Sequence, residues 1–125
     1  MPFSWVDYLS LAERLLPGTD EADRRTAISR AYYAVFNLAN AWLESRRPLP
    51  LTVGGRHEQV WAEFNKGSAA AQQVARNGER LKQRRVKADY RVPYEGDLAF
   101  EAATAVTLSR KVSRAIETLT HGDVP

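Results

Sequence analysis

Apolar side chains recur along this chain at spacings of three and four residues, and this periodicity constrains the fold more than any other feature. The clearest stripe, on one face of a single helix, consists of Ile28, Tyr32, Val35, Ala39 and Trp42. A second stripe repeats at heptad spacing near the C-terminus, at Ala105, Leu108, Val112, Ala115 and Leu119. No segment of four or more residues alternates in the way a half-buried strand would, so no sheet is predicted. The pattern predicts an all-α protein.

Proline, glycine and capping residues divide the chain into five helical segments. Pro17-Gly18 ends the first segment, and Pro48 ends the second because a proline cannot continue a helix. Ser68 and Asp97 are predicted to cap the fourth and fifth segments. The helices are expected over about 4–16, 20–46, 56–66, 68–91 and 97–120, with a loop over 47–55.

Short links between these segments favour an antiparallel, up-and-down bundle of four long helices and one short helix. A chain of 125 residues is one domain, here 1–125, with an ordered core at about 4–120 and a tail from His121 that is expected to fray. Gly78 inside the fourth helix costs up to about 1 kcal/mol relative to alanine. It therefore indicates either a close approach of another backbone or a local break.

The composition of the chain limits which metal centres, nucleophiles and cofactor sites it can form. The chain has no cysteine and only two histidines, which excludes cysteine-ligated metal centres and cysteine nucleophiles and leaves little for a histidine-based metal site. No phosphate-binding glycine loop, zinc-protease motif or nucleophile elbow occurs, so neither a metal nor another cofactor is expected. No apolar run approaches the ~20 residues that span a bilayer, and Asp7 interrupts the N-terminal stretch where a signal peptide needs apolar residues. We expect a cytoplasmic protein.

The net charge of +3 is unevenly distributed. Residues 76–91 contain seven basic and two acidic side chains, a local charge of +5 that leaves −2 for the rest of the chain. Four of the cations would share one helical ridge, the basic stripe, which consists of Arg76, Arg80, Arg84 and Lys87. The stripe can bind nucleic-acid phosphates, with Tyr90 and Tyr94 stacking on exposed bases, or it can be a solvated face whose cations complement the helix dipole.

The second helix carries a polar stripe beside its apolar one. Asp23, Arg30 and Asn37 are seven residues apart and so differ by only about 20° around the helix axis, with Tyr33 between the last two. One interpretation is an ordinary solvated face with an Asp23–Arg30 contact. The other is a site in which Arg30 holds an anion.

The run Ser-Arg-Ala-Tyr-Tyr-Ala-Val-Phe-Asn at 29–37 resembles the signature helix of HEPN domains, small helical proteins of prokaryotic toxin–antitoxin and defence systems. Arg-His-Glu-Gln-Val at 56–60 followed by Phe64, and Arg84 or Arg85 followed by Ala-Asp-Tyr at 88–90, are also similar to small HEPN proteins. The resemblance covers roughly 4–120 and implies a homodimer with the two signature helices near each other. Catalytic members cleave RNA without metal, using an arginine followed after four to six residues by a histidine. Arg30 matches that arginine, and Asn37 stands where the histidine is expected.

This departure bears on catalysis, because an imidazole can transfer a proton near neutral pH and an amide cannot. Asn37 and Tyr33 can position a phosphate held by Arg30, whereas losing general acid–base help costs about 10²–10⁴ in rate. His57 is a candidate substitute or, alternatively, a helix-capping or core histidine, and His121 is expected to be inert.

Two functions follow from the resemblance and the charge pattern. The first is an RNA- or nucleotide-phosphate-binding protein of a toxin–antitoxin or defence system, either an active metal-independent endoribonuclease or a formerly active one. The second is a non-enzymatic HEPN partner of a small nucleotidyltransferase, in which the same surface docks a protein or is itself modified on tyrosine.

Overall fold

Every regular element in the described part of the chain is helical, which confirms the all-α prediction. The computed structural model describes residues 2–46 and 55–125, so the predicted loop over 47–55 lies, apart from Gly55, outside the described residues. The elements are α1 (Val6–Leu15), α2 (Glu21–Arg46), α3 (Arg56–Asn65), α4 (Ala69–Tyr90), α5 (Leu98–Thr118) and a 3₁₀ turn, η1 (His121–Asp123). At ten residues α1 is as short as α3, so three of the described helices are long rather than the expected four.

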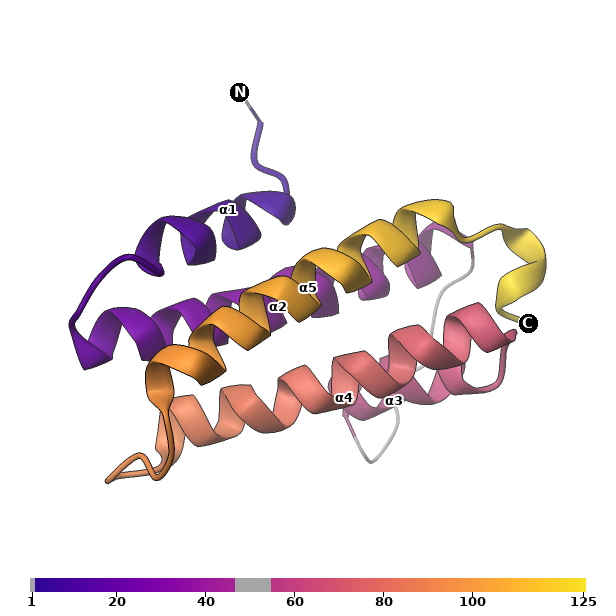
Figure 1. The fold of residues 1–125 in the computed structure, drawn as a ribbon. Helices are drawn as coiled ribbons and strands as arrows, with labels where there is room; N and C mark the ends of the chain where they lie inside the picture. The colour runs from indigo at the N-terminus through magenta and orange to yellow at the C-terminus, as the bar shows by residue number, and fades with distance from the viewer. Residues whose placement is uncertain (1, 47–54) are drawn as a thin grey trace.

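The helices form a bundle around α2 (Figure 1). Figure 1 shows α1 running back along α2, and α5 running back along α4. The central helix packs against all four others, and its stripe residues Ile28, Tyr32, Val35 and Ala39 are completely buried. Trp42, the last residue of that stripe, lies at the edge of the core. The apolar periodicity of α2 therefore identified the centre of the bundle.

Two predicted helix caps are confirmed. The hydroxyl of Ser68 accepts a hydrogen bond from the backbone N–H of Ala71 at 3.2 Å, and the Asp97 carboxylate accepts one from Phe100 at 3.0 Å. Both side chains thereby satisfy N–H groups that have no partner within the helix. These caps set where α4 and α5 begin.

Gly78 lies where an aromatic side chain, rather than another backbone, approaches α4. A Cβ atom at this position would lie 2.6 Å from ring atoms of Trp61, which is buried in α3. Helix α4 continues through Gly78 without a break. The missing side chain therefore lets α3 pack closely on α4.

The buried face of α5 is rotated relative to the predicted heptad stripe. Its core positions are Ala102, Ala105, Val106, Ser109, Val112, Ser113 and Ile116. Ser109 is buried because its hydroxyl donates a 2.8 Å hydrogen bond to the carbonyl oxygen of Ala31 in α2. Leu108, expected in the core, is only partly buried. Two small serines, Ser109 and Ser113, thus occupy core positions that apolar periodicity does not detect.

The C-terminal segment, which was expected to fray, is docked on the bundle. Val124 is 1% exposed, and the carboxylate of Asp123 accepts a 2.8 Å hydrogen bond from Ser68. Arg46, at the end of α2, donates to the carbonyl oxygens of His121 and Val124. These hydrogen bonds hold the segment against the start of α4 and the end of α2.

Candidate functional site

Arg30 lies on α2 between two tyrosine rings. Its guanidinium carbon is 4.8 Å from the ring centroid of Tyr8 in α1 and 4.8 Å from that of Tyr33, one turn along α2. Its Nη2 donates a 3.4 Å hydrogen bond to the hydroxyl of Ser29. No carboxylate among the described residues pairs with Arg30, so the Asp23–Arg30 contact considered above does not form. The guanidinium charge is held by aromatic faces, which attract cations without neutralising them.

A second arginine, Arg85 of α4, approaches the same tyrosine. Its guanidinium carbon lies 5.4 Å from the Tyr33 centroid and 6.0 Å from that of Tyr90. The side chain is 11% exposed, and its Nε is buried with no hydrogen-bond acceptor among the described residues. Arg85 therefore holds an unused donor beside Tyr33.

One carboxylate connects the two arginines. Asp89 lies 3.7 Å from Nη1 of Arg85 and accepts a 3.3 Å hydrogen bond from the hydroxyl of Ser29, which in turn accepts from Arg30. Two guanidinium charges and one carboxylate give this group a charge of +1. We call Arg30, Tyr33, Arg85 and Asp89 with Ser29 the arginine cluster.

Of this cluster, only Arg30 and Tyr33 were predicted from the sequence to belong to a site. Arg85 lies off the predicted basic stripe, and its pairing with Asp89 is an i, i+4 contact that the Arg-x-x-x-Asp spacing in α4 indicates. Nothing in the sequence by itself showed that this pair would face Ser29, which is 60 residues away.

His57, near the start of α3, contacts the edge of the same group of rings. Its ring stacks on Phe36 with centroids 3.8 Å apart and meets Tyr33 edge to face at 6.0 Å. The fold therefore brings His57 and Arg30 to the same tyrosine, although no contact joins them directly.

A hydrogen-bond chain determines where the proton of His57 resides. The indole N–H of Trp61 donates to the Tyr32 hydroxyl at 3.3 Å, and that hydroxyl lies 2.6 Å from Nδ1 of His57. The buried phenol proton needs an acceptor, and Nδ1 is the acceptor that the described residues place within its reach. We therefore assign Tyr32 as the donor to Nδ1, so that the neutral imidazole carries its proton on Nε2. Burial lowers the pKa of His57 below its ordinary value, and the charges of Arg85 and Lys82 lower it further. Burial likewise raises the pKa of Tyr32, which keeps the phenol protonated.

Asn37 is engaged by its own helix. Its amide nitrogen donates a 2.8 Å hydrogen bond to the carbonyl oxygen of Tyr33, one turn earlier. The structure therefore directs the donor group of Asn37 to backbone, and no hydrogen bond joins it to Arg30.

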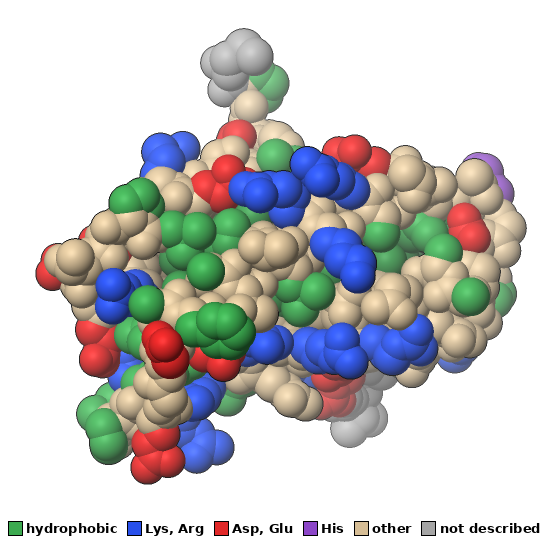
Figure 2. All heavy atoms as spheres, viewed as in Figure 1, with side chains coloured by type: hydrophobic (Ala, Val, Ile, Leu, Met, Phe, Trp, Pro, Cys, Tyr) green, Lys and Arg blue, Asp and Glu red, His purple; other side chains and the backbone are tan. Residues whose placement is uncertain are grey.

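The basic stripe faces α5 rather than the arginine cluster. Arg84 forms a 2.9 Å ion pair with Glu101 of α5, and Lys87 donates to the carbonyl oxygen of Glu95. Among the described residues, Arg76 and Arg80 hydrogen-bond only to the neighbouring amide side chains of Gln73 and Asn77, and both remain exposed. Figure 2 shows this row of basic side chains over α4.

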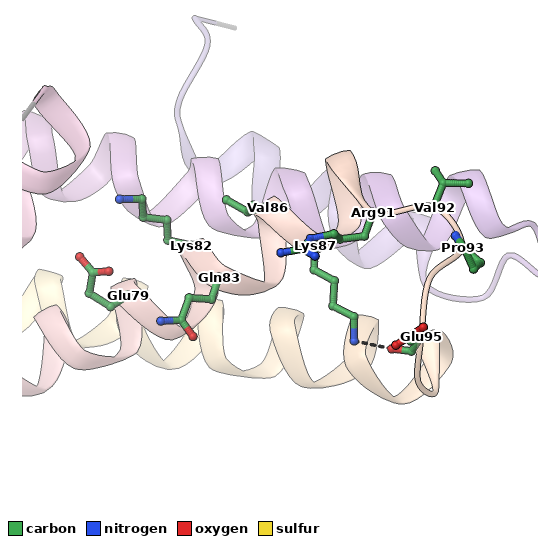
Figure 3. A pocket seen from close by; sticks show the side chains of 9 residues that line it. All are labelled: Glu79, Lys82, Gln83, Val86, Lys87, Arg91, Val92, Pro93 and Glu95. Carbon is green, nitrogen blue, oxygen red and sulfur yellow. Dashed lines mark hydrogen bonds between the residues drawn. The ribbon is translucent and has the colours of Figure 1, made fainter.

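A hollow of about 710 Å³ follows another side of α4 and the turn after it (Figure 3). Lys82 and Arg91 line it and have no partner among the described residues, whereas Lys87 reaches across it to Glu95. Tyr90, which follows in the helix, is 71% exposed and can stack on a base. Tyr94 is less suited to this role, because the cations of Arg25 and Lys87 lie over its ring.

Within residues 2–46 and 55–125, no group of three or more acidic or histidine side chains is arranged to hold a metal ion. None of the helices in the same ranges is long and apolar enough to cross a membrane. Comparisons with protein-family models, curated proteins and solved structures find no significant match to this chain.

Proposed function

We propose that the protein binds RNA or nucleotide phosphate at the arginine cluster. The observation that carries this proposal is the convergence of Arg30 and Arg85 on Tyr33, where Asp89 is the one carboxylate among the described residues that pairs with the cluster. A guanidinium presents N–H donors in a planar fork that matches two phosphate oxygens. Arg85 already has a buried Nε without an acceptor. A phosphodiester beside Tyr33 would offset the excess positive charge of the two guanidinium groups.

Single-stranded RNA is the substrate class that fits best. Its bases are free to stack, and Tyr90 presents an exposed ring 6.0 Å from the Arg85 guanidinium. The free cations Lys82 and Arg91 of the neighbouring hollow extend the positive surface along α4. Phosphates can therefore follow α4 while a base stacks on Tyr90.

The proposal is recognition without efficient cleavage. Metal-free cleavage needs a group that removes the 2′-hydroxyl proton or protonates the leaving oxygen. His57 has its Nδ1 occupied by Tyr32 and its proton on Nε2, so its neutral form offers no free lone pair, and a lowered pKa disfavours its acidic form. Asn37 supplies no titratable proton. These residues favour binding over turnover.

The resemblance to HEPN domains supports a homodimer formed near α2 and a role in a cytoplasmic toxin–antitoxin or defence system. Light scattering on the purified protein would test the dimer. Incubating wild type and Arg30→Ala with total RNA and a chelator would test cleavage, for which we expect equal, background levels.

Binding is tested by fluorescence anisotropy with a short single-stranded RNA at several salt concentrations. For single strands the log–log salt slope changes by about 0.7 for each phosphate contact. Arg30→Ala and Arg85→Ala should each weaken binding and make the slope shallower by about that amount. Arg14→Ala, an exposed arginine on α1, removes the same charge and should leave both unchanged. Absence of RNA binding, or equal effects of all three variants, would refute the proposal and favour the protein-partner role.

A further inference from the structure

A groove of about 500 Å³ runs between α4 and α5, separate from the arginine cluster. Arg80 and Arg84 line it from α4, and Phe100, Thr104, Leu108 and Lys111 line it from α5. The α5 positions recur every three or four residues and span about 16 Å along the helix. They form a continuous stripe of three turns on the side of α5 that the bundle leaves uncovered.

The floor of this groove is apolar. Phe100 is 63% exposed, and Leu108, predicted to be in the core, is only partly buried here. Ala103 and Thr107 lie between them, so the middle of the stripe carries small side chains that allow a second helix to approach closely. Phe100 and Leu108 therefore leave a partly exposed apolar strip along the groove.

The rims of the groove are basic. Arg80 and Lys111 are exposed and have no carboxylate partner among the described residues, while Arg84 is neutralised by Glu101. The described residues that line the groove include no acidic side chain. Figure 2 shows basic side chains over α4 and over α5, with apolar and uncharged atoms between the two sets.

These features select one kind of occupant. A second copy using the same face would place Arg80 and Lys111 against like charges, because a two-fold interface pairs a surface with itself. RNA that followed the basic stripe along α4 would leave the apolar floor of the groove unused. An acidic amphipathic helix complements both the apolar floor and the basic rims of the groove. Its apolar side chains would pack on Phe100 and Leu108, and its carboxylates would pair with the cations at the rims.

We propose that the α4–α5 groove is a docking site for an acidic amphipathic helix of a partner protein. The site acts independently of RNA binding at the arginine cluster, because it uses different residues of α4 and a different neighbouring helix. Partner docking and phosphate binding are therefore separable by mutation.

The probe is a fluorescein-labelled synthetic peptide of about 15 residues, long enough to cover the three turns. Leucines occupy one helical face and glutamates the other, and a second peptide of the same composition scatters the leucines around the helix. Anisotropy titrations use the full chain. The amphipathic peptide should bind saturably, and Arg80→Glu combined with Lys111→Glu should weaken it at least about tenfold. Arg114→Glu reverses one exposed cation on α5 outside the groove, the same charge change as either of these substitutions alone, and should alter affinity less than about twofold.

Thr104→Arg places a bulky cation on the floor of the groove and should also abolish peptide binding while retaining RNA binding. Equal binding of the two peptides, equal effects of Arg114→Glu and Lys111→Glu, or no saturable binding would overturn the proposal. Loss of RNA binding in Lys111→Glu would assign the groove to nucleic acid instead. Self-association that Thr104→Arg abolishes would assign it to a second copy of the chain, which would equally overturn the proposal.

Discussion

Replacing Tyr32 by phenylalanine tests the hydrogen-bond chain that sets the protonation of His57. The substitution removes one hydroxyl from the centre of the bundle and leaves the ring in place. That hydroxyl accepts from the Trp61 indole and donates to Nδ1 of His57. Tyr32 is completely buried and Trp61 is 2% exposed, so water does not readily replace the lost partner.

The expected cost follows from the groups left without partners. A buried N–H that loses its acceptor costs about 1–3 kcal/mol, and the lost bond to His57 adds about 1 kcal/mol. We therefore expect Tyr32→Phe to lower the free energy of unfolding by about 2–4 kcal/mol. Removing an oxygen leaves little empty volume, so a cavity contributes little to this figure.

Tyr33→Phe is the matched control, because it makes the same chemical change at the next residue. The Tyr33 hydroxyl has no hydrogen-bond partner among the described residues, and the ring stays between Arg30 and Arg85. Urea denaturation followed by tryptophan fluorescence measures both variants, and nitrogen chemical shifts of His57 report which ring nitrogen carries the proton. Comparable, small effects of the two substitutions, or a wild-type imidazole protonated on Nδ1, would refute the reasoning.

Three further predictions concern the rest of the bundle. Because the folded pKa of His57 lies below its ordinary value of about 6.5, the unfolded chain binds the extra proton first. Stability measured by urea denaturation should be constant above about pH 6.5 and fall as pH decreases below it, and a decrease that persists unchanged in His57→Gln would contradict this origin. Gly78→Ala should destabilise by about 1–2 kcal/mol in thermal unfolding, because overpacking against the indole ring outweighs the gain in helix propensity. Its control, exposed Ala41→Gly on α2, measures propensity alone, and a stabilised Gly78→Ala would show that the ring moves aside. Ser109→Ala should cost about 1 kcal/mol in urea denaturation by removing its bond to α2, whereas Ser113→Ala, whose hydroxyl makes no bond among the described residues, should cost less. Equal losses would contradict that assignment.

Local features of the sequence predicted the helices well. Ser68 and Asp97 cap the helices that they were expected to cap, because a cap acts on backbone groups two or three residues away. The stripe of α2 was also correct, because a helix surrounded by others must be apolar on the faces that they cover. The docked tail was missed, because its partners, Arg46 and Ser68, are distant in sequence.

The candidate site was predicted in part. Arg30 and Tyr33 lie together as their helical spacing requires, but Arg85 was grouped with a basic run whose members lie on different sides of α4. Arg84 pairs with Glu101 of α5, whereas Lys82 and Arg91 line the hollow on another side. The spacing of residues along a helix predicts which of them lie on the same ridge. It does not state which neighbour that ridge will face, since this depends on how all the helices pack at once.

The sequence alone determined that the chain is helical, where the described helices begin, and that a positive charge excess lies on α4, because each of these depends on residues a few positions apart. Only the tertiary structure decided that Arg85 meets Arg30 across Tyr33 and that the Tyr32 hydroxyl lies 2.6 Å from Nδ1 of His57. The tertiary structure also places Leu108 in the lining of a groove rather than in the core. The rotation of each helix about its axis is set by close packing with its neighbours, and that rotation assigns every side chain to the core, to a site or to the surface.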